Sequence, residues 1–243
     1  MWISNSRRYQ GWQIGKYQII RYIGAGRYGV CFLAETNGRK VILKRLKRSL
    51  FKRNQGNPAF EIQILSQLNH PGVPRFLEIV TEKDFYGLAL EHKDGDTVET
   101  MLFKQKHRFT PPEIFNIGGR LIEIIRYLHE KGIVHRDIRI PNVLINGNQV
   151  SLIDFGLARW ADEKRYTKGT DLSYLGDFLL FLFYSNYQKQ KQKSRPWYEE
   201  LALTDAQRLF LKRLLRLAAP YSNIDEVALD FHSFFQNLFN GGD

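Results

Sequence analysis

Two acids and an amide stand close together around a predicted hairpin. Asp137 and Asn142 precede a short apolar run at residues 143–145, and Asp154 follows a second apolar run at residues 150–153. An Asn-Gly pair lies between the two runs, and such a pair is a strong signal for a two-residue hairpin turn. Antiparallel pairing of the two runs would bring the three polar side chains to one rim.

These side chains suit a hard divalent cation and a hydroxyl group that must lose its proton. Magnesium takes oxygen ligands, and it uses one or two carboxylates together with substrate phosphates. The remaining carboxylate can accept a proton from a nucleophile. The His-Arg-Asp segment that ends at Asp137, with Asn142 five residues later, and the Asp-Phe-Gly segment that begins at Asp154 resemble the catalytic loop and the metal loop of protein kinases.

The resemblance implies a role for each of these residues. Asp137 accepts the hydroxyl proton, and Asn142 and Asp154 hold Mg²⁺. Arg139 stands two residues after Asp137, where the family usually has a lysine, and it keeps a positive charge near the transferred phosphoryl group. The implied cofactors are ATP and Mg²⁺, and the implied partner is a protein substrate with a serine or threonine acceptor.

A glycine-rich segment at residues 24–31 lies between two strand-like runs at residues 17–23 and 30–36. Glycines bend tightly and let backbone amides approach phosphate oxygens. A position between two strands favours a flap over the strand-to-helix turn of a dinucleotide site. We expect Cys31, in the roof of the adenine slot, to be an inert small apolar residue. The resemblance assigns nucleotide contacts to Ile23, Gly24, Ala25, Gly26, Arg27, Tyr28, Gly29, Val30, Cys31, Ile42, Lys44, Leu90 and Glu91.

Lys44 and Glu61 complete the set of charged residues that the resemblance implies. Lys44 ends an apolar strand-like run, and Glu61 follows an Asn-Pro pair at residues 57–58 that favours the start of a helix. In the family, the lysine orders the α- and β-phosphates and the glutamate holds the lysine. The helix is expected to bury an apolar face formed by Ile62, Leu65 and Leu68.

The resemblance implies an α+β, two-lobed protein-kinase-like fold that forms a single domain over residues 1–243. A small, mainly antiparallel N-lobe covers residues 1–91, a hinge whose backbone meets the adenine covers 91–95, and a mainly α-helical C-lobe covers 96–243. Capping patterns at residues 96–99 and 110–113 predict the first two C-lobe helices. The second of these is expected to bury the stripe Ile114, Ile117, Leu121, Ile124, Ile125 and Leu128.

The chain departs from the family after the Asp-Phe-Gly segment. The usual Ala-Pro-Glu anchor is missing, and so is its late arginine partner, for which residues 218–222 are the matching region. Loss of both is consistent, since one buried charge without the other is costly. Asp171 stands where the family has an aspartate at the start of its central helix. The short activation segment offers Thr167, Thr170 and Ser173 as candidate autophosphorylation sites.

Composition limits the class of protein. The chain has 243 residues, of which 43% are hydrophobic, and a formal net charge of +11. The charge favours acidic partners, but no motif predicts a specific nucleic-acid interaction. The longest apolar run, residues 178–184, is too short to span a membrane, and a single cysteine excludes an internal disulfide framework. We therefore expect a cytoplasmic protein, with no prediction of oligomeric state.

Three functions remain open from the residues alone. The first is an ATP-dependent serine/threonine protein kinase, similar to the compact soluble kinases of the bacterial PrkD/YbdM-like group. The second is a small-molecule phosphotransferase with the same fold. The missing Ala-Pro-Glu anchor favours it, but Arg136 and the lack of insertions in the second lobe argue against it. The third is a catalytically inactive nucleotide-binding scaffold, which the presence of every charged catalytic group disfavours.

Overall fold

The structure, a computed structural model, describes residues 9–26, 29–47, 58–82, 85–162, 164–187 and 195–236. The chain forms two compact units, Met1–Lys93 with Phe155–Leu157, and Asp94–Asp154 with Ala158–Asp243. The main boundary falls inside the range 91–95 that we expected for the hinge. Residues 155–157, which we assigned to the second lobe, belong to the first unit.

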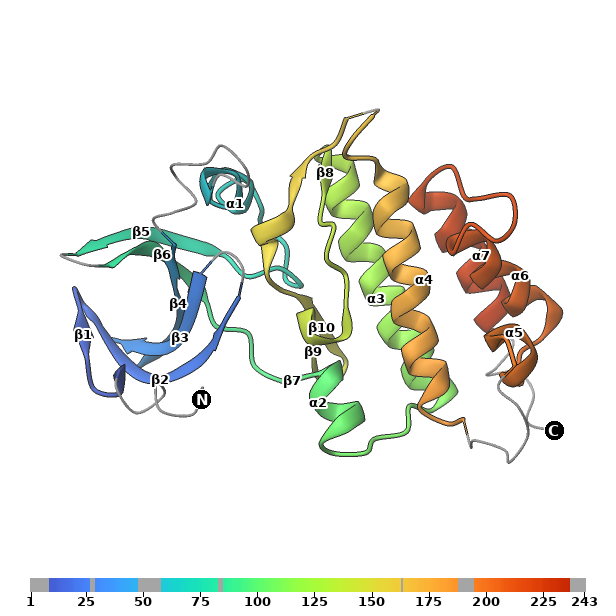
Figure 1. The fold of residues 1–243 in the computed structure, drawn as a ribbon, viewed down its shortest axis with the longest axis horizontal. Helices are drawn as coiled ribbons and strands as arrows, with labels where there is room; N and C mark the ends of the chain where they lie inside the picture. The colour runs from blue at the N-terminus through green and yellow to red at the C-terminus, as the bar shows by residue number, and fades with distance from the viewer. Residues whose placement is uncertain are drawn as a thin grey trace. The chain divides into compact units, whose positions relative to one another are not determined.

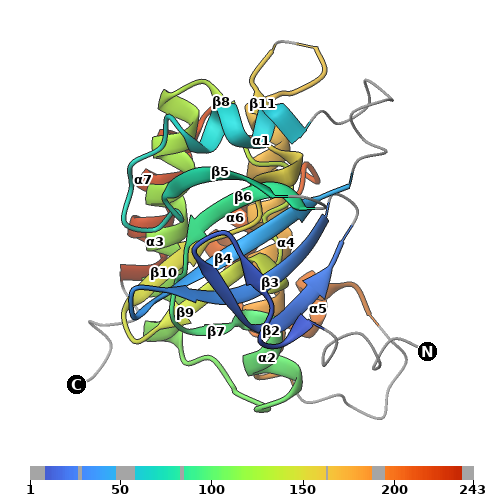
Figure 2. The same cartoon turned by 90° about the vertical axis from the view of Figure 1, so that its left-hand side faces the viewer.

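A curled six-stranded antiparallel sheet makes up most of the first unit (Figures 1 and 2). Its order is β1-β2-β3-β4-β6-β5, and the register places Lys44 opposite Cys31 on one side and Leu88 on the other. The strands are β1 (Gln13–Ile14), β2 (Tyr17–Ala25), β3 (Gly29–Thr36), β4 (Arg39–Leu46), β5 (Phe76–Glu82) and β6 (Phe85–Glu91). The edge strand β5 was not predicted, because its alternation of apolar and polar residues is short and irregular.

The hairpin between β3 and β4 follows directly from the sequence. Asn37 and Gly38 both have positive φ, 49° and 70°, and Thr36 pairs with Arg39 across them. Asn-Gly pairs favour this two-residue turn because both positions tolerate the left-handed conformation. The turn therefore sets the register that carries Lys44 to its place on β4.

Helix α1 (Pro58–Leu65) and the short helix η5 (Phe155–Leu157) pack together in the first unit. Glu61, Ile64, Leu65 and Leu68 are buried, whereas Ile62 is only half-buried. The predicted buried face is therefore correct for Leu65 and Leu68 but not for Ile62. The buried side of the helix includes Ile64 and the carboxylate of Glu61 instead. The predicted N-cap Asn57 lies outside the described residues.

The second unit is mainly α-helical (Figure 1). Its helices are α2 (Val98–Phe103), α3 (Pro111–Glu130), η4 (Ile140–Asn142), α4 (Lys168–Tyr184), α5 (Trp197–Glu200), α6 (Asp205–Leu214) and α7 (Ile224–Gln236). Two small sheets, β10-β9-β7 and β11-β8, are formed by β7 (Asp96–Thr97), β8 (Ile133–Val134), β9 (Val143–Asn146), β10 (Gln149–Leu152) and β11 (Arg159–Trp160). In the part of the chain that the structure describes, no helix has the length and apolar character needed to cross a membrane.

The helix starts were predicted with mixed success. The capping box of Thr110 and Glu113 at the start of α3 is confirmed. For α2, the cap is Thr97, whose side chain accepts a hydrogen bond from the Thr100 backbone N–H, and not the preceding Asp96. Asp96 is instead part of strand β7, which pairs with β9.

The predicted stripe of α3 is buried, and the structure explains the glycine at its centre. A Cβ atom added at Gly118 would lie 2.4 Å from Cζ of Phe231 on α7. Phe231 is fully buried and stacks on Phe115 with ring centroids 5.6 Å apart. Glycine is required here because the α7 ring occupies the space of a side chain, and this packing offsets the helix-weakening effect of glycine.

Candidate functional site

The second unit carries the predicted catalytic loop, and its side chains contact one another. Asn142 donates from Nδ2 to Oδ2 of Asp137 at 2.7 Å and to the Asp137 carbonyl at 2.9 Å. Arg139 forms a two-pronged contact with the same carboxylate, Nε to Oδ1 at 2.6 Å and Nη2 to Oδ2 at 2.9 Å. Paired contacts of this kind fix the plane of a carboxylate as well as its position.

Asp171 anchors this loop from the first turn of α4. The Asp171 carboxylate is fully buried and accepts the backbone N–H groups of His135 at 2.8 Å and Arg136 at 2.7 Å. His129 Nε2 also lies 3.1 Å from the same carboxylate. Arg136 has a φ of 66°, which is uncommon for a residue other than glycine. The two N–H bonds therefore hold a strained backbone position directly before Asp137.

His135 is buried in this loop as a neutral ring. Burial lowers the pKa of His135, against the opposing effect of nearby carboxylates, with Asp171 the strongest of them. Its Nδ1 accepts the backbone N–H of Asp137 at 3.3 Å, which requires that nitrogen to be unprotonated. His135 therefore supports the backbone of the loop and does not act as a cation.

The hairpin predicted after Asn142 is confirmed, with β9 paired to β10 in antiparallel register; its two turn residues are Gly147 and Asn148, since Asn146 pairs with Gln149. The backbone N–H of Ile153 donates to the Asn142 carbonyl at 2.9 Å, so Asp154 follows directly on a residue bonded to Asn142. Asp154 is exposed and has a φ of 62°. Asp137 and Asn142 are thus in direct contact. Asp154 directly follows Ile153, whose backbone N–H is bonded to Asn142.

The donor set at this rim fits Mg²⁺. Asn142 uses Nδ2 toward Asp137, which leaves its Oδ1 as a possible ligand, and Asp154 offers a carboxylate at the surface. Mg²⁺ usually takes one or two protein oxygens and fills its other positions with water and phosphate oxygens. Within the described ranges, no group of three or more His, Cys, Asp and Glu residues could hold a metal by itself. The oxygens of Asn142 and Asp154 therefore suit an ion that also takes oxygen ligands from water or phosphate.

The first unit carries the predicted lysine–glutamate pair. Lys44 Nζ lies 2.7 Å from Oε1 of Glu61, and the two side chains are only 6% and 2% exposed. A buried pair of this kind fixes both side chains, since removing either partner leaves an uncompensated charge. Because side chains alternate along a strand, Ile42 shares the sheet face of Lys44, and Cys31 lies opposite Lys44 on the neighbouring strand.

Of the three flap glycines, packing requires Gly29 but gives no reason for Gly24 or Gly26. A Cβ atom at Gly29 would lie 2.3 Å from the Arg45 carbonyl oxygen, so Gly29 is required by strand pairing. A Cβ atom at Gly24 or Gly26 would meet nothing within 4 Å in the described structure, and neither has positive φ. Packing therefore gives no reason for these two glycines. The predicted contacts of Arg27 and Tyr28 lie outside the described residues.

The remaining predicted nucleotide contacts differ in exposure. Ile23 is bulged out of the β2–β3 pairing and is 44% exposed, whereas Val30 is half-buried and Leu90 is 8% exposed. Ala25, the last residue of β2, pairs with Val30. The Glu91 backbone N–H donates to the Arg75 carbonyl at 2.9 Å. The Glu91 N–H is therefore already used, and the predicted hinge contact with adenine is left to the other backbone groups of residues 91–95.

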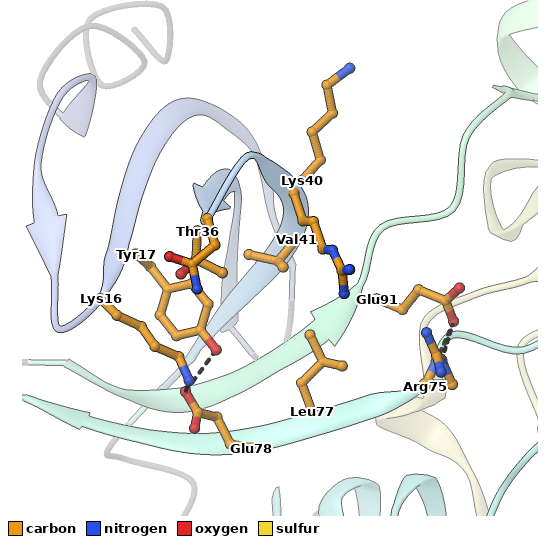
Figure 3. A pocket seen from close by; sticks show the side chains of 11 residues that line it. Lys16, Tyr17, Thr36, Lys40, Val41, Arg75, Leu77, Glu78 and Glu91 are labelled. Atoms are coloured by element: carbon orange, nitrogen blue, oxygen red, sulfur yellow. Dashed lines mark hydrogen bonds and ion pairs between the residues drawn. The ribbon is translucent and has the colours of Figure 1, made fainter.

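A cavity of about 590 Å³ lies at the other end of β4 and belongs entirely to the first unit (Figure 3). Its two carboxylates already have partners. Glu78 accepts from the Tyr17 hydroxyl at 2.7 Å and pairs with Lys16 at 3.0 Å. Glu91 pairs with Arg75 at 3.4 Å, and hydrogen bonds lower the pKa of both carboxyls. The Glu91 side chain thus points into this cavity, and no predicted catalytic side chain lines it.

The candidate autophosphorylation sites lie at or inside α4. Thr167 is the N-cap residue, and its Oγ1 lies 3.4 Å from Oγ1 of Thr170. Ser173 donates to the Gly169 carbonyl at 3.2 Å and is half-buried within the helix. All three side chains are half-buried; Thr167 precedes the helix, whereas Thr170 and Ser173 lie within it.

Tyr221 occupies the region where the family arginine is missing. Its hydroxyl donates to Asp230 at 2.7 Å, and the Arg213 guanidinium stacks on its ring at 3.7 Å. Arg213 also contacts Asp230 at 2.9 Å. This cluster joins α6 to α7 and leaves no buried charge without a partner at that position.

Two residues that contact the catalytic loop, His129 and Tyr166, were not predicted. The role of His129 was missed, although a histidine at a buried position of an apolar helix is a usable signal for a buried polar partner. Tyr166 was also missed, and its ring lies 4.5 Å from the Arg136 guanidinium. No local pattern marks an aromatic residue in a basic loop as a contact of the catalytic loop.

Comparison with known proteins agrees with this arrangement. A family model described as "Protein kinase domain" matches residues 17–191. The chain is 35% identical over 237 residues to the "Probable serine/threonine-protein kinase YbdM" of Bacillus subtilis, covering 92% of this chain and 91% of that protein. It is 37% identical over 150 residues to the "CTD kinase subunit alpha" of Schizosaccharomyces pombe, covering 59% of this chain and 25% of that protein. It is 33% identical over 161 residues to the "Serine/threonine-protein kinase dkf-2" of Caenorhabditis briggsae, covering 63% of this chain and 14% of that protein.

Proposed function

The chain belongs to the protein kinase family, and we propose that it transfers the γ-phosphoryl group of ATP to a serine or threonine hydroxyl of a protein, using Asp137 as the proton acceptor. The observation that carries this proposal is the contact of Asp137 with Asn142 and Arg139 in a loop held by the buried Asp171. Similarity to YbdM over nearly the whole length of both proteins supports the protein-kinase reading over the alternatives.

Asp137 is suited to the hydroxyl proton because its carboxylate is held but not enclosed. The side chain is 13% exposed, and the contacts with Asn142 and Arg139 restrict its rotation. A positioned base of this kind contributes roughly 10²–10⁴-fold to rate. Arg139, at 55% exposure, keeps a cation beside the carboxylate and close to where the transferred group would develop charge.

Asn142 and Asp154 would hold Mg²⁺, and Lys44 would order the ATP phosphates. Bound Mg²⁺ bridges phosphate oxygens and neutralises the charge that develops during transfer. The 2.7 Å contact with Glu61 supports the role of Lys44, since it fixes the ammonium in one place. Gly24 and Gly26, which no packing among the described residues requires, support a close approach of the flap backbone to phosphate oxygens. The cytoplasmic location and the lack of a specific nucleic-acid partner stay predictions.

The test is an assay with labelled ATP, Mg²⁺, generic protein acceptors and a mixture of small metabolites. Three proteins are compared: the wild type, Asp137→Asn, and Asp177→Asn as a matched control on the exposed side of α4. We expect label on protein that falls at least about 100-fold in Asp137→Asn and stays unchanged in the control. Label on metabolites alone would support the small-molecule kinase, and nucleotide binding without any transfer would support the inactive scaffold.

A further inference from the structure

Four exposed cations form a surface beside the catalytic loop, here called the basic rim. It consists of Lys164, Arg165, Lys168 and Arg216, all in the second unit. Within the described ranges, none of the four forms an ion pair with a carboxylate. The phosphoryl-transfer chemistry proposed above uses none of them, so their concentration at this place needs another explanation.

Two acidic residues near the basic rim, Asp162 and Asp171, are committed to other contacts, and Glu163 lies outside the described residues. Oδ1 of Asp162 accepts the backbone N–H groups of Lys164, Arg165 and Tyr166 at 2.9, 2.5 and 2.9 Å. These bonds lower the pKa of Asp162, which keeps it ionised. Its Oδ1 is already used to hold the backbone of this turn. Asp171 is buried beneath the catalytic loop. Among the described residues of 162–168, three cations therefore face solvent beside one exposed carboxylate, that of Asp162.

An aromatic ring, that of Tyr166, lies between the basic rim and Arg136 of the catalytic loop. The Tyr166 ring lies 4.5 Å from the Arg136 guanidinium and 5.2 Å from that of Arg165. Arg136 is the residue directly before Asp137. Stacking of guanidinium groups on an aromatic face is favourable and orders both partners. The rim is thus held next to the residue where the acceptor hydroxyl must bind.

The fourth cation reaches the rim from a distant part of the chain. Arg216 follows α6, has a φ of 60°, and lies with Nη2 only 2.9 Å from where a Cβ atom of Gly169 would be. The absence of a side chain at Gly169 lets the guanidinium lie against the first turn of α4. Two separate segments therefore place positive charge on one surface.

We propose that this kinase prefers acceptor serines or threonines flanked by acidic side chains, which the basic rim binds. The inference rests on the proposed function and deepens it by naming the substrate class. Each exposed ion pair contributes a factor of about two to five, so two or three pairs give a preference of about tenfold. Because these charges face solvent, the preference should shrink as salt shortens the screening length to below about 10 Å.

The test uses three peptides that share one acceptor serine and carry glutamate, alanine or arginine at the flanking positions. We expect kcat/KM to be about tenfold higher for the glutamate peptide than for the alanine peptide, and lowest for the arginine peptide. The double variant Arg165→Glu/Lys168→Glu should lose or reverse this order while its KM for ATP stays unchanged. Lys104→Glu, an exposed cation at the C-terminal end of α2, is the control for the change in net charge and should keep the order.

The outcomes separate the two proposals. Equal kcat/KM for the three peptides, or a preference for arginine, would overturn the acidic preference and leave phosphoryl transfer intact. An order that survives in the double variant would also overturn it, since the rim would then not be its source. Absence of transfer to every protein and peptide acceptor would overturn both proposals together.

Discussion

Replacing Asp171 by asparagine should damage both stability and catalysis, although the side chain keeps its size. Asp171 accepts the N–H groups of His135 and Arg136 through different carboxylate oxygens, and it is fully buried. An asparagine has only one carboxamide oxygen, so its NH₂ group must face one of the two N–H donors. One backbone N–H of the catalytic loop then loses its acceptor.

The size of the effect follows from these contacts. A hydrogen bond to a charged group contributes about 1.5–3 kcal/mol, and a buried N–H left without a partner costs about 1–3 kcal/mol. We therefore expect Asp171→Asn to lower the free energy of unfolding by about 3–5 kcal/mol. The released backbone at Arg136 should move away from its positive φ, and a displacement of about 1 Å near a reacting group can cost about 100-fold in kcat.

Urea unfolding and steady-state kinetics with Mg-ATP measure the two effects. Asp177→Asn is the matched control, because it makes the same substitution on the exposed side of the same helix. Because the Asp177 side chain is exposed, we expect its amide to change the free energy of unfolding by no more than about 0.5 kcal/mol. The free energies of unfolding of the two variants should therefore differ by at least about 2 kcal/mol.

One result would refute the reasoning. If Asp171→Asn unfolds within about 1 kcal/mol of the wild type and keeps its kcat, the two backbone bonds do not hold the catalytic loop. A loss of stability with unchanged kcat in the remaining folded protein would retain the structural role of Asp171 but refute its positioning of Asp137.

Three further predictions test other parts of the site. Gly29→Ala should destabilise the first unit by about 1–3 kcal/mol because its methyl group overlaps a main-chain oxygen of β4, whereas Gly24→Ala should leave urea unfolding unchanged and raise the KM for ATP. Glu61→Gln should lower the free energy of unfolding by about 3 kcal/mol, since the buried Lys44 ammonium loses its counter-charge; an unchanged urea midpoint would contradict this. The free energy of unfolding should be constant above about pH 6.5 and fall by up to about 1 kcal/mol between pH 6.5 and 5.5. In that range the unfolded chain protonates His135, whereas the folded state keeps the ring neutral because burial lowers its pKa. His135→Asn should remove that part of the pH dependence.

Local sequence signals predicted the elements that local interactions form. The Asn37-Gly38 turn, the Thr110 capping box and the α3 stripe depend on residues that are close along the chain, so their patterns are visible in the sequence. The motifs around Asp137 and Asp154 also identified the family, which the comparisons show. The pairing of Lys44 with Glu61 followed from that resemblance and not from any local pattern, and the structure bears it out.

The tertiary structure decided the contacts that join distant parts of the chain. Asp171 accepts a hydrogen bond from the N–H of His135, which is 36 residues earlier in the chain. No local pattern near either residue predicts that bond. The same is true of Gly118, whose missing side chain makes room for Phe231, and of Gly169, which makes room for Arg216. Short-range signals fix turns and helix ends because backbone conformation depends on near neighbours. Which distant group fills a space or satisfies a buried charge is settled only when the packed units exist.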